Sequence, residues 1–408
     1  MCGCNSGAIG CPKDPRCGSG AGPNRKRQRR NLGGSPPFVG SQGLSLACAA
    51  LYAEAMNRKP DTELRRGWTT GACATAAVKS ALSKLWTGAF VDPVSITLPR
   101  GEQPAFPLAH SAYSHEWAEA GITKDAGDDP DVTHGCLVIA RVMQGAAGTG
   151  VVFHAGDGVG IVTRPGLPVA VGEPAVNPVP RAMMVHEVTE LALRHGYAGD
   201  VEITLSIPGG DILASKTWNP RLGITGGLSV LGTTGIVRPF SCAAWIASIH
   251  RGIDVARAGG LRHVAGCTGA TSERIVQTLY GLPDHAMLDM GDFAGGLLKY
   301  LARHPVDHIT IGGGIGKMTK LSQGARDLHS GRSQVDLQAL AKRVARPELA
   351  QMNTALEAVT VGGARVAEAV ATDALGVIST ILGTAPITVD VVIIDRAGAI
   401  LARSGTPP

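Results

Sequence analysis

Hydrophobic positions recur with helical or strand spacing along most of the chain, and the pattern changes near residue 255. An alanine-rich stretch over 71–86 follows two threonines that suit a helix N-cap, and a second helix is expected over 181–195. The segment 208–240 is dense in Gly, Pro, Thr and Asn without periodicity, and a loop of that length is usually functional. Apolar residues with strand character predict strands over 94–98, 136–143, 150–153 and 201–207.

After residue 255, a unit of strand, glycine turn and helix repeats three times. Such units build parallel sheets with helices on both faces. The expected strands are 261–265, 286–288, 307–311 and 387–394, and the expected helices are 271–281, 293–303, one after Lys317, 335–357 and 363–382. The chain is therefore predicted to be an α/β protein of two domains: an N-terminal α/β substrate domain over 60–255 and a C-terminal Rossmann-like parallel-sheet domain over 256–405.

Residues 1–55 differ from the rest in composition. They are rich in Gly, Ser, Pro, Cys and Arg without periodicity, so they have too little apolar surface to offset the entropy of ordering. We expect a disordered tail, or a mis-assigned start with Met56 as the natural first residue. Five of the nine cysteines lie there, with spacing that fits no paired CxxC zinc pattern.

Charge and cysteine usage narrow the functional classes. The net charge of +5 belongs to residues 1–55, whereas the remainder has equal numbers of basic and acidic residues. We therefore expect no nucleic-acid partner. No apolar run reaches the ~18 residues of a membrane span, and four scattered cysteines in the body are typical of a reduced, cytoplasmic protein. Neither the charge nor the cysteine usage indicates whether the chain forms a homo-oligomer.

Glycine makes up 55 of the 408 residues, about twice the usual ~7%, and two glycine loops follow expected strands. Ligands of doubly wound sheets bind beyond the carboxyl ends of the strands. A phosphate-binding GxxxxGK[ST] loop is excluded, because Ile311 and Met318 occupy two of its required positions. A strict GxGxxG is also absent. The predicted cofactor-binding glycines are Gly266, Gly269, Gly312, Gly313, Gly314 and Gly316.

Asp289 ends the expected strand between these two loops, and a carboxylate there suits the hydroxyls of a ribose. Together the glycines and this acid predict a pocket for a nucleoside-like ligand with little phosphate, a description that S-adenosylmethionine fits. The alternative is that the glycines only allow helices to pack closely against strands.

Five ordered segments of the chain have a distinctive sequence: Arg65–Ala74 (RRGWTTGACA), Lys124–Thr133 (KDAGDDPDVT), Gly158–Thr163, Gly172–Arg181 and Asn219–Gly235. Together they resemble the CbiD family of cobalt-precorrin-5B C(1)-methyltransferases. The resemblance extends from about Arg65 to Asp395. Both glycine loops depart from the family's usual GNYGE and GHxGK.

The resemblance implies S-adenosylmethionine-dependent methylation of C1 of cobalt-precorrin-5B, giving cobalt-precorrin-6A in anaerobic cobalamin biosynthesis. Cobalt would arrive inside the tetrapyrrole substrate, so no metal site of the protein is expected. A non-catalytic tetrapyrrole carrier of the same pathway is the alternative. The many carboxylates of such a substrate require cations or helix N-termini along a cleft lined by the first domain. The predicted substrate-binding residues are Thr69, Thr70, Lys124, Arg164, Arg181, Lys216 and Arg221.

The run Asp125, Asp128, Asp129 and Asp131 is the candidate for proton chemistry. Asp125, Asp128 and Asp129 are predicted to be catalytic, one acting as a base and another orienting Lys124. The alternative is a turn-forming acidic loop. His304 and His308 are four residues apart, but the intervening proline keeps them off one helical face, so no zinc site is expected.

Overall fold

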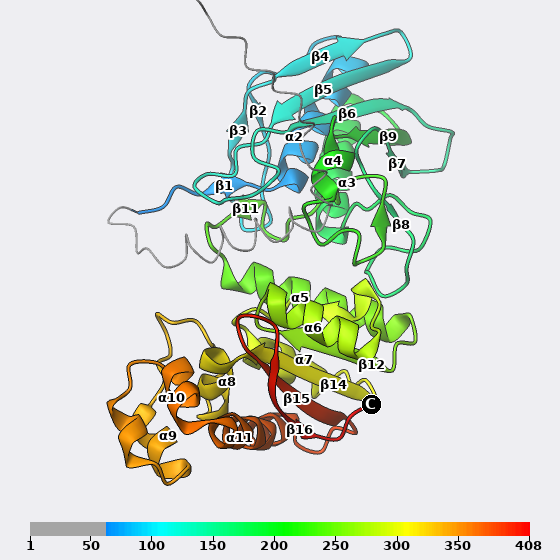
Figure 1. Cartoon of the computed structure of the whole chain (residues 1–408). Helices are drawn as coiled ribbons and strands as arrows, with labels where there is room; N and C mark the ends of the chain where they lie inside the picture. The colour runs from blue at the N-terminus through cyan, green and yellow to red at the C-terminus, as the bar shows by residue number, and fades with distance from the viewer. Residues whose placement is uncertain (1–62) are drawn as a thin grey trace, which may run out of the picture. The chain divides into compact units, whose positions relative to one another are not determined.

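Two five-stranded sheets with their helices form most of the regular structure in the computed structural model, which describes residues 63–408 (Figure 1). Both sheets contain parallel strands and both are covered by helices, so the chain has a mixed α/β fold. The predictions made for residues 1–55 lie outside the described residues.

The first sheet has the strand order β4-β5-β6-β9-β7, and only the β7–β9 pair within it is parallel. Alternate residues of β6 and β9 are buried, as expected when one face packs on a core. Its strands are β4 (His110–Tyr113), β5 (Trp117–Thr123), β6 (Leu137–Gln144), β7 (Val151–Ala155) and β9 (Val201–Ser206).

Helix α2 (Thr70–Thr87) packs against β5, β6 and α3 (Pro178–His195). Its many alanines are buried on all sides, because a side chain no larger than a methyl lets the helix lie between the sheet and α3. The helix begins where Thr69 Oγ1 accepts a hydrogen bond from Ala72 N (3.2 Å), and it ends at Gly88. Both helices predicted in this half are confirmed.

Three short strand pairs complete the first half, and one of them, β8 with β10, joins two segments that resemble the CbiD family. The predicted loop 208–240 contributes to two of them and also contains α4 (Gly210–Ala214), so it is ordered by pairing with distant segments. The pairs are β1 (Gly67–Trp68) with β11 (Ile236–Val237), β2 (Val94–Ser95) with β3 (Ala105–Phe106), and β8 (Ile161–Val162) with β10 (Ile224–Thr225).

The second sheet has the order β13-β12-β14-β15-β16, and only β16 runs antiparallel. The elements of this half are α5 (Cys242–Ala258), β12 (His263–Cys267), α6 (Ala270–Tyr280), η1 (Asp284–Ala286), β13 (Met287–Leu288), α7 (Ala294–Leu301), β14 (His308–Gly314), α8 (Ile315–Ser322), α9 (Leu337–Arg343), η2 (Pro347–Gln351), α10 (Ala355–Gly362), α11 (Ala364–Leu382), β15 (Thr388–Ile394) and β16 (Ile400–Gly405).

Separate hydrophobic clusters support the two sheets. One cluster joins α2 and α3 to the first sheet. A second lies under α5, α7, α8 and α11, and a third lies between the second sheet and α6. Helix α5 crosses the predicted boundary at residue 255, and its buried Ile249, Ile253 and Ala256 belong to the second cluster.

One expectation about the helices of the second half differs from the structure. The single helix predicted over 335–357 is wrong, because the chain there forms α9, η2 and α10. Pro347 begins η2 and cannot donate the backbone hydrogen bond that a continuous helix requires.

None of the helices described over residues 63–408 combines the length and hydropathy needed to cross a membrane.

Candidate functional site

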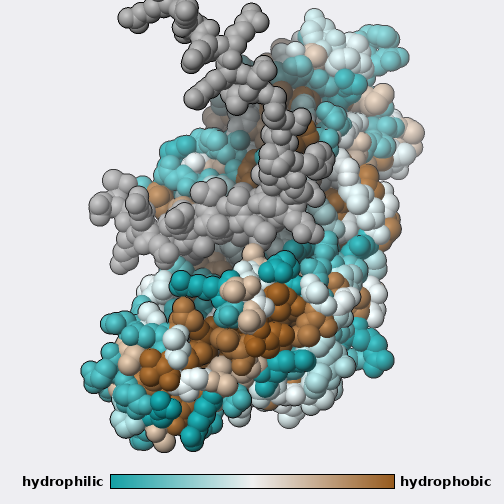
Figure 2. Space-filling model, viewed as in Figure 1, coloured by the Kyte–Doolittle hydropathy of each residue, from teal (hydrophilic) through white to brown (hydrophobic). Residues whose placement is uncertain are grey.

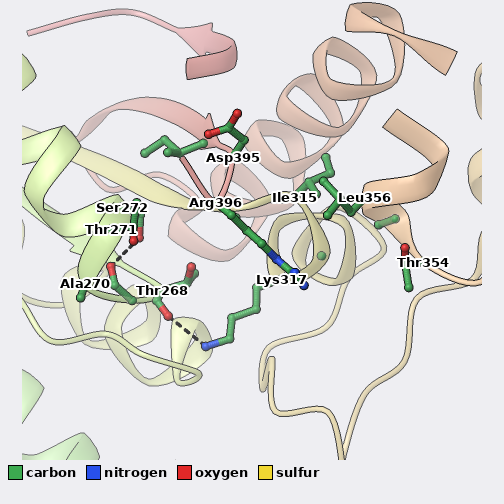
Figure 3. A pocket seen from close by; sticks show the side chains of 15 residues that line it. Thr268, Ala270, Thr271, Ser272, Ile315, Lys317, Thr354, Leu356, Asp395 and Arg396 are labelled. Carbon is green, nitrogen blue, oxygen red and sulfur yellow. Dashed lines mark hydrogen bonds between the residues drawn. The ribbon is translucent and has the colours of Figure 1, made fainter. Parts of the chain in front are cut away.

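A cavity of about 520 Å³ lies beyond the carboxyl ends of β12, β14 and β15 (Figure 3). Helix α6 follows β12 on one face of the sheet, and α8 follows the neighbouring β14 on the other face. Adjacent strands whose helices lie on opposite faces mark the point where doubly wound proteins bind ligands. The lining residues are Thr268–Ser272, Gly314–Lys317, Thr354–Leu356 and Ile394–Arg396. Around this region, over α8 and the β15–β16 hairpin, apolar surface gathers on the face shown in Figure 2.

The predicted glycines divide into two groups. Gly269, Gly314 and Gly316 line the cavity, and a Cβ added to any of them would meet no atom closer than 3.9 Å. A Cβ on Gly266, Gly312 or Gly313 would instead lie within 3.0 Å of packed side chains, such as Leu297 or Val276. The close-packing interpretation therefore suits the second group, whereas the first group leaves open space for a ligand.

Helix N-termini, two cations and the carboxylate of Asp395 border the cavity. Helices α6, α8 and α10 all begin at it, and helix N-termini carry partial positive charge. The N-caps of α6 and α8 make no side-chain hydrogen bond. Lys317 donates from Nζ to Thr268 O (2.9 Å) and pairs with Asp292 (2.9 Å), and Arg396 extends into the pocket (Figure 3). This lining suits a ligand with an anionic group and an apolar or nucleoside body.

Asp289 does not line this cavity. It borders a smaller one of about 20 Å³, together with Trp218, Arg221 and His285. Its Oδ2 is buried and accepts no hydrogen bond from the residues described. Burial, with a smaller contribution from Glu273, raises the pKa of Asp289 to about 7, against the opposing influence of Arg221 and Lys317. Its predicted contact with a ribose stays a prediction.

The acidic loop is bound to the chain that precedes α2. Asp125 binds the Arg65 guanidinium, which holds the pKa of that carboxyl below its ordinary value, and also accepts from Gly127 N (2.9 Å). Asp128 accepts from Arg65 N (2.6 Å), and Asp129 accepts from Phe240 N (2.8 Å). Each predicted catalytic acid therefore holds backbone in place, as the turn-forming interpretation expects.

Lys124 is buried at 2% exposure, and its ammonium contacts Asp131 and Thr133. In this conformation it is not available to a substrate, contrary to the role predicted for it. Burial raises the pKa of the neighbouring Cys73 to about 12, so this thiol stays protonated and behaves as a small apolar side chain.

The predicted threonines are also buried. Thr69 uses its hydroxyl to cap α2, and Thr70 is the first residue of that helix. A Cβ on Gly232 would lie 2.3 Å from Thr69 Oγ1, so the loop 208–240 covers this helix end. The structure thus supports the simple N-cap interpretation for Thr69, whereas Thr70 is a buried residue of the first helical turn.

Of the four remaining cations, Arg181 lies in the first turn of α3, and Arg164, Lys216 and Arg221 lie outside helices and strands. Arg181 donates to Val176 O (2.9 Å) and pairs with Glu173, and Arg221 pairs with Glu273 and stacks over Trp218. Arg164 has a buried Nη1 without a hydrogen-bond partner among residues 63–408. Lys216 is half-buried just after α4. Of these four cations, Arg164 is the one with a buried side-chain donor that no described residue satisfies.

Thr354, Asp395 and Arg396 line the large cavity and were missed from the sequence. Their segments are far from the glycine loops along the chain. Asp395 and Arg396 could have been found from the expected strand 387–394, because they follow its carboxyl end and parallel strands end at the same edge of a sheet. Lys317 was recognised in the second loop, but not as a cavity residue.

Comparisons with known proteins agree on one family. The family model CbiD matches residues 57–239, and the model described as CbiD, C-terminal domain, matches residues 327–405. A cobalt-precorrin-5B C(1)-methyltransferase of Brucella anthropi is 57% identical over 84% of this chain and 96% of its own length. One of Paramagnetospirillum magneticum is 56% identical over 83% and 97%, respectively. A crystal structure of the cobalamin biosynthesis protein cbiD from Archaeoglobus fulgidus matches with 26% identity and a TM-score of 0.37, over 67% of this chain and 84% of that one.

Proposed function

Because the chain belongs to the CbiD family, we propose that it transfers a methyl group from S-adenosylmethionine to C1 of cobalt-precorrin-5B, giving cobalt-precorrin-6A in anaerobic cobalamin biosynthesis. Relatives that are 55–57% identical over nearly their whole length carry this enzyme's name. The four described cysteines are free, in keeping with a reducing cytoplasm as the place of this activity.

The observation that carries the cofactor assignment is the cavity at the ends of β12 and β14. Its volume of about 520 Å³ falls in the ~300–1,000 Å³ range of small-molecule pockets. Ile315, Leu356 and Ile394 offer apolar surface to an adenosyl group, and the uncapped starts of α6 and α8 suit a carboxylate. The residues present therefore fit S-adenosylmethionine.

When bound, S-adenosylmethionine supplies an electrophilic methyl on a sulfonium, and transfer to carbon is an in-line displacement. The protein contributes chiefly alignment of donor and acceptor. Gly269, Gly314 and Gly316 keep space for the donor. The buried Nη1 of Arg164 has no partner among the described residues, so we keep Arg164 as the candidate for a substrate carboxylate, to which its surroundings would have to open. No covalent nucleophile from the chain is required.

We also propose that the second half is a Rossmann-like cofactor domain, predicted over 256–405, and that the first half is the acceptor domain. The separate clusters under the two sheets support this division. Because the buried residues of α5 join the second cluster, we favour a boundary just before Cys242.

The cofactor assignment is tested by filling the cavity. Gly316 is in α8, has no positive φ, and its added Cβ meets nothing within 4 Å, so Gly316→Leu places a side chain in the open space without backbone strain. The matched control is Gly376→Leu in α11, where the same two conditions hold away from the cavity. We expect calorimetry with S-adenosylhomocysteine to show binding by the wild type and Gly376→Leu, and at least about a 100-fold loss for Gly316→Leu, because filled volume excludes the ligand.

The reaction is tested with cobalt-precorrin-5B and methyl-labelled S-adenosylmethionine, followed by NMR of the product. Label at C1 is the expected result. A protein that binds the macrocycle tightly, transfers no label and is indifferent to Gly316→Leu would be a carrier, and the proposed activity would be rejected.

A further inference from the structure

Polar side chains gather at the amino edge of the second sheet, opposite the strand ends that border the cavity. His263 pairs in register with His308, and Thr310 pairs with Asp390. Because side chains alternate between faces, these residues share the face of Ala265 and Val392, which α6 covers. The interior of a sheet covered by helices is usually apolar. This polar cluster therefore requires an explanation.

The cluster is closely spaced. His308 Nε2 lies 2.9 Å from Asp390 Oδ1, and His263 Nε2 lies 2.8 Å from Thr310 Oγ1, which in turn bonds Asp390. His308 and Asp390 are buried, and His263 is half-buried. In the part of the chain that the structure describes, these two histidines and the aspartate form a group whose ligand atoms all lie within 4.8 Å of one another.

We propose that His263, His308 and Asp390 form a binding site for a divalent transition-metal ion of the zinc class. Two imidazoles and one carboxylate are a donor set that such ions accept. Three ligand atoms bound at about 2.0–2.2 Å from one ion, with tetrahedral or trigonal angles, lie about 3.3–3.8 Å from one another. The present spacing of up to 4.8 Å therefore needs to close by at most about 1–1.5 Å when an ion binds.

The surroundings hold the ligands in orientation. Thr388 donates its hydroxyl proton to Asp307 O (2.9 Å), so its oxygen accepts from Nδ1–H of His308 (2.7 Å). That bond turns Nε2 of His308 toward the cluster, as a hydrogen bond to the second ring nitrogen does in metal sites. Asp390 is held on its other oxygen by Tyr280, which receives a hydrogen bond from Arg403 (2.5 Å).

The positions of the three ligands indicate how an ion would enter the site and how it would affect the sheet. His263 is the accessible ligand at the start of β12, whereas the other two come from β14 and β15. A bound ion would connect three neighbouring strands at the edge away from the cofactor cavity. The site is thus separate from the proposed methyl transfer and stabilises the sheet. It also revises the expectation of no metal site: His304 stacks on Tyr300 instead, with ring centroids 4.0 Å apart.

The test is metal retention by the full chain. Purified protein is loaded with Zn²⁺ alone, passed into metal-free buffer and measured by plasma mass spectrometry. A parallel sample takes Co²⁺, whose visible absorption reports low-coordinate nitrogen and oxygen ligands. We expect the wild type to retain one zinc ion more per chain than His263→Gln or Asp390→Asn, and to melt at a higher temperature with zinc than without it.

Two further variants make the result specific. His304→Gln removes a histidine of the same half outside the cluster, and it should bind like the wild type. Thr388→Val removes only the hydroxyl that orients His308, and should weaken zinc binding about 10- to 100-fold. Near-UV circular dichroism establishes that each variant is folded.

The decisive quantity is the difference in retained zinc between the wild type and His263→Gln. Any zinc held by the cysteines of residues 1–55 is the same in both proteins and cancels. Equal zinc content in these two folded proteins would overturn the proposal, as would cobalt spectra that show only thiolate charge transfer. Thr388→Val binding like the wild type, or His304→Gln losing the ion, would equally count against it.

Discussion

Replacing Lys124 by methionine separates a structural role from a substrate-binding one. The Lys124 side chain is 2% exposed and that of its partner Asp131 is 23% exposed, so the pair is largely shielded from water. Methionine keeps most of the side-chain volume but leaves the Asp131 carboxylate without its cation. Removing one member of a buried ion pair costs about 3–5 kcal/mol. The partial exposure of Asp131 favours the lower end, about 3 kcal/mol.

For a folding unit of about 150–250 residues, a loss of about 3 kcal/mol in the free energy of unfolding lowers the melting temperature by roughly 6–12 °C. Differential scanning calorimetry at pH 7 measures it. The control is Arg346→Met, which breaks an ion pair whose side chains are 40% and 47% exposed and should cost less than about 1 kcal/mol.

The pH dependence gives a second readout. Burial acts to raise the pKa of Asp131, but Lys124 and Thr133 more than offset it, so its pKa lies below the ordinary value. The associated stability is present above the unfolded pKa and is lost as the pH falls through the folded one. Lys124→Met should therefore differ most from the wild type near neutral pH and approach it in acid. A variant that melts like the wild type but binds the tetrapyrrole weakly would refute the structural assignment.

Two further substitutions test the packing of the acidic loop and the burial of the Asp289 carboxyl. Gly127→Ala should destabilise by at least about 2 kcal/mol more than Gly135→Ala in urea unfolding. Both glycines have positive φ, but only at Gly127 would a Cβ lie 2.2 Å from Arg65 O; equal losses would contradict that contact. Asp289→Asn should remove a fall in stability between about pH 4 and 7, because a pKa raised to about 7 means that the folded state holds a proton the unfolded state has lost. The difference between the wild type and Asp289→Asn is expected to reach about 2–4 kcal/mol at pH 8, and parallel pH profiles would show that the carboxyl is not buried as described.

Local pattern predicted much of the secondary structure, including α2, α3 and the parallel strands of the second sheet. The predictions failed where local signals were weak or competing. Helix α5 was missed although Ser241 caps it, and strands β4, β5 and β16 were missed because few of their residues follow a clear apolar alternation. The predicted helix over 335–357 ignored Pro347, whose missing N–H ends the helix before it.

For the site, the sequence indicated the glycine loops, because ligands of doubly wound sheets bind beyond the carboxyl ends of the strands, where these glycines lie. It did not indicate which glycines pack side chains and which face a cavity, because that depends on atoms from other elements. Gly316 faces open space, whereas a Cβ on Gly312 would meet Val276.

What the sequence by itself determined was the family, the α/β class and the positions where strands give way to glycine turns, because these depend on order and spacing along the chain. Only the tertiary structure decided which charged groups are already engaged in hydrogen bonds or ion pairs within the chain. Backbone amides and Arg65 take up the acids of the loop, and Asp131 takes up Lys124. It also brought together His263, His308 and Asp390 from three strands. Short-range polar interactions depend on distance in space, and distance in space is set by the packing of the sheet and not by separation along the chain.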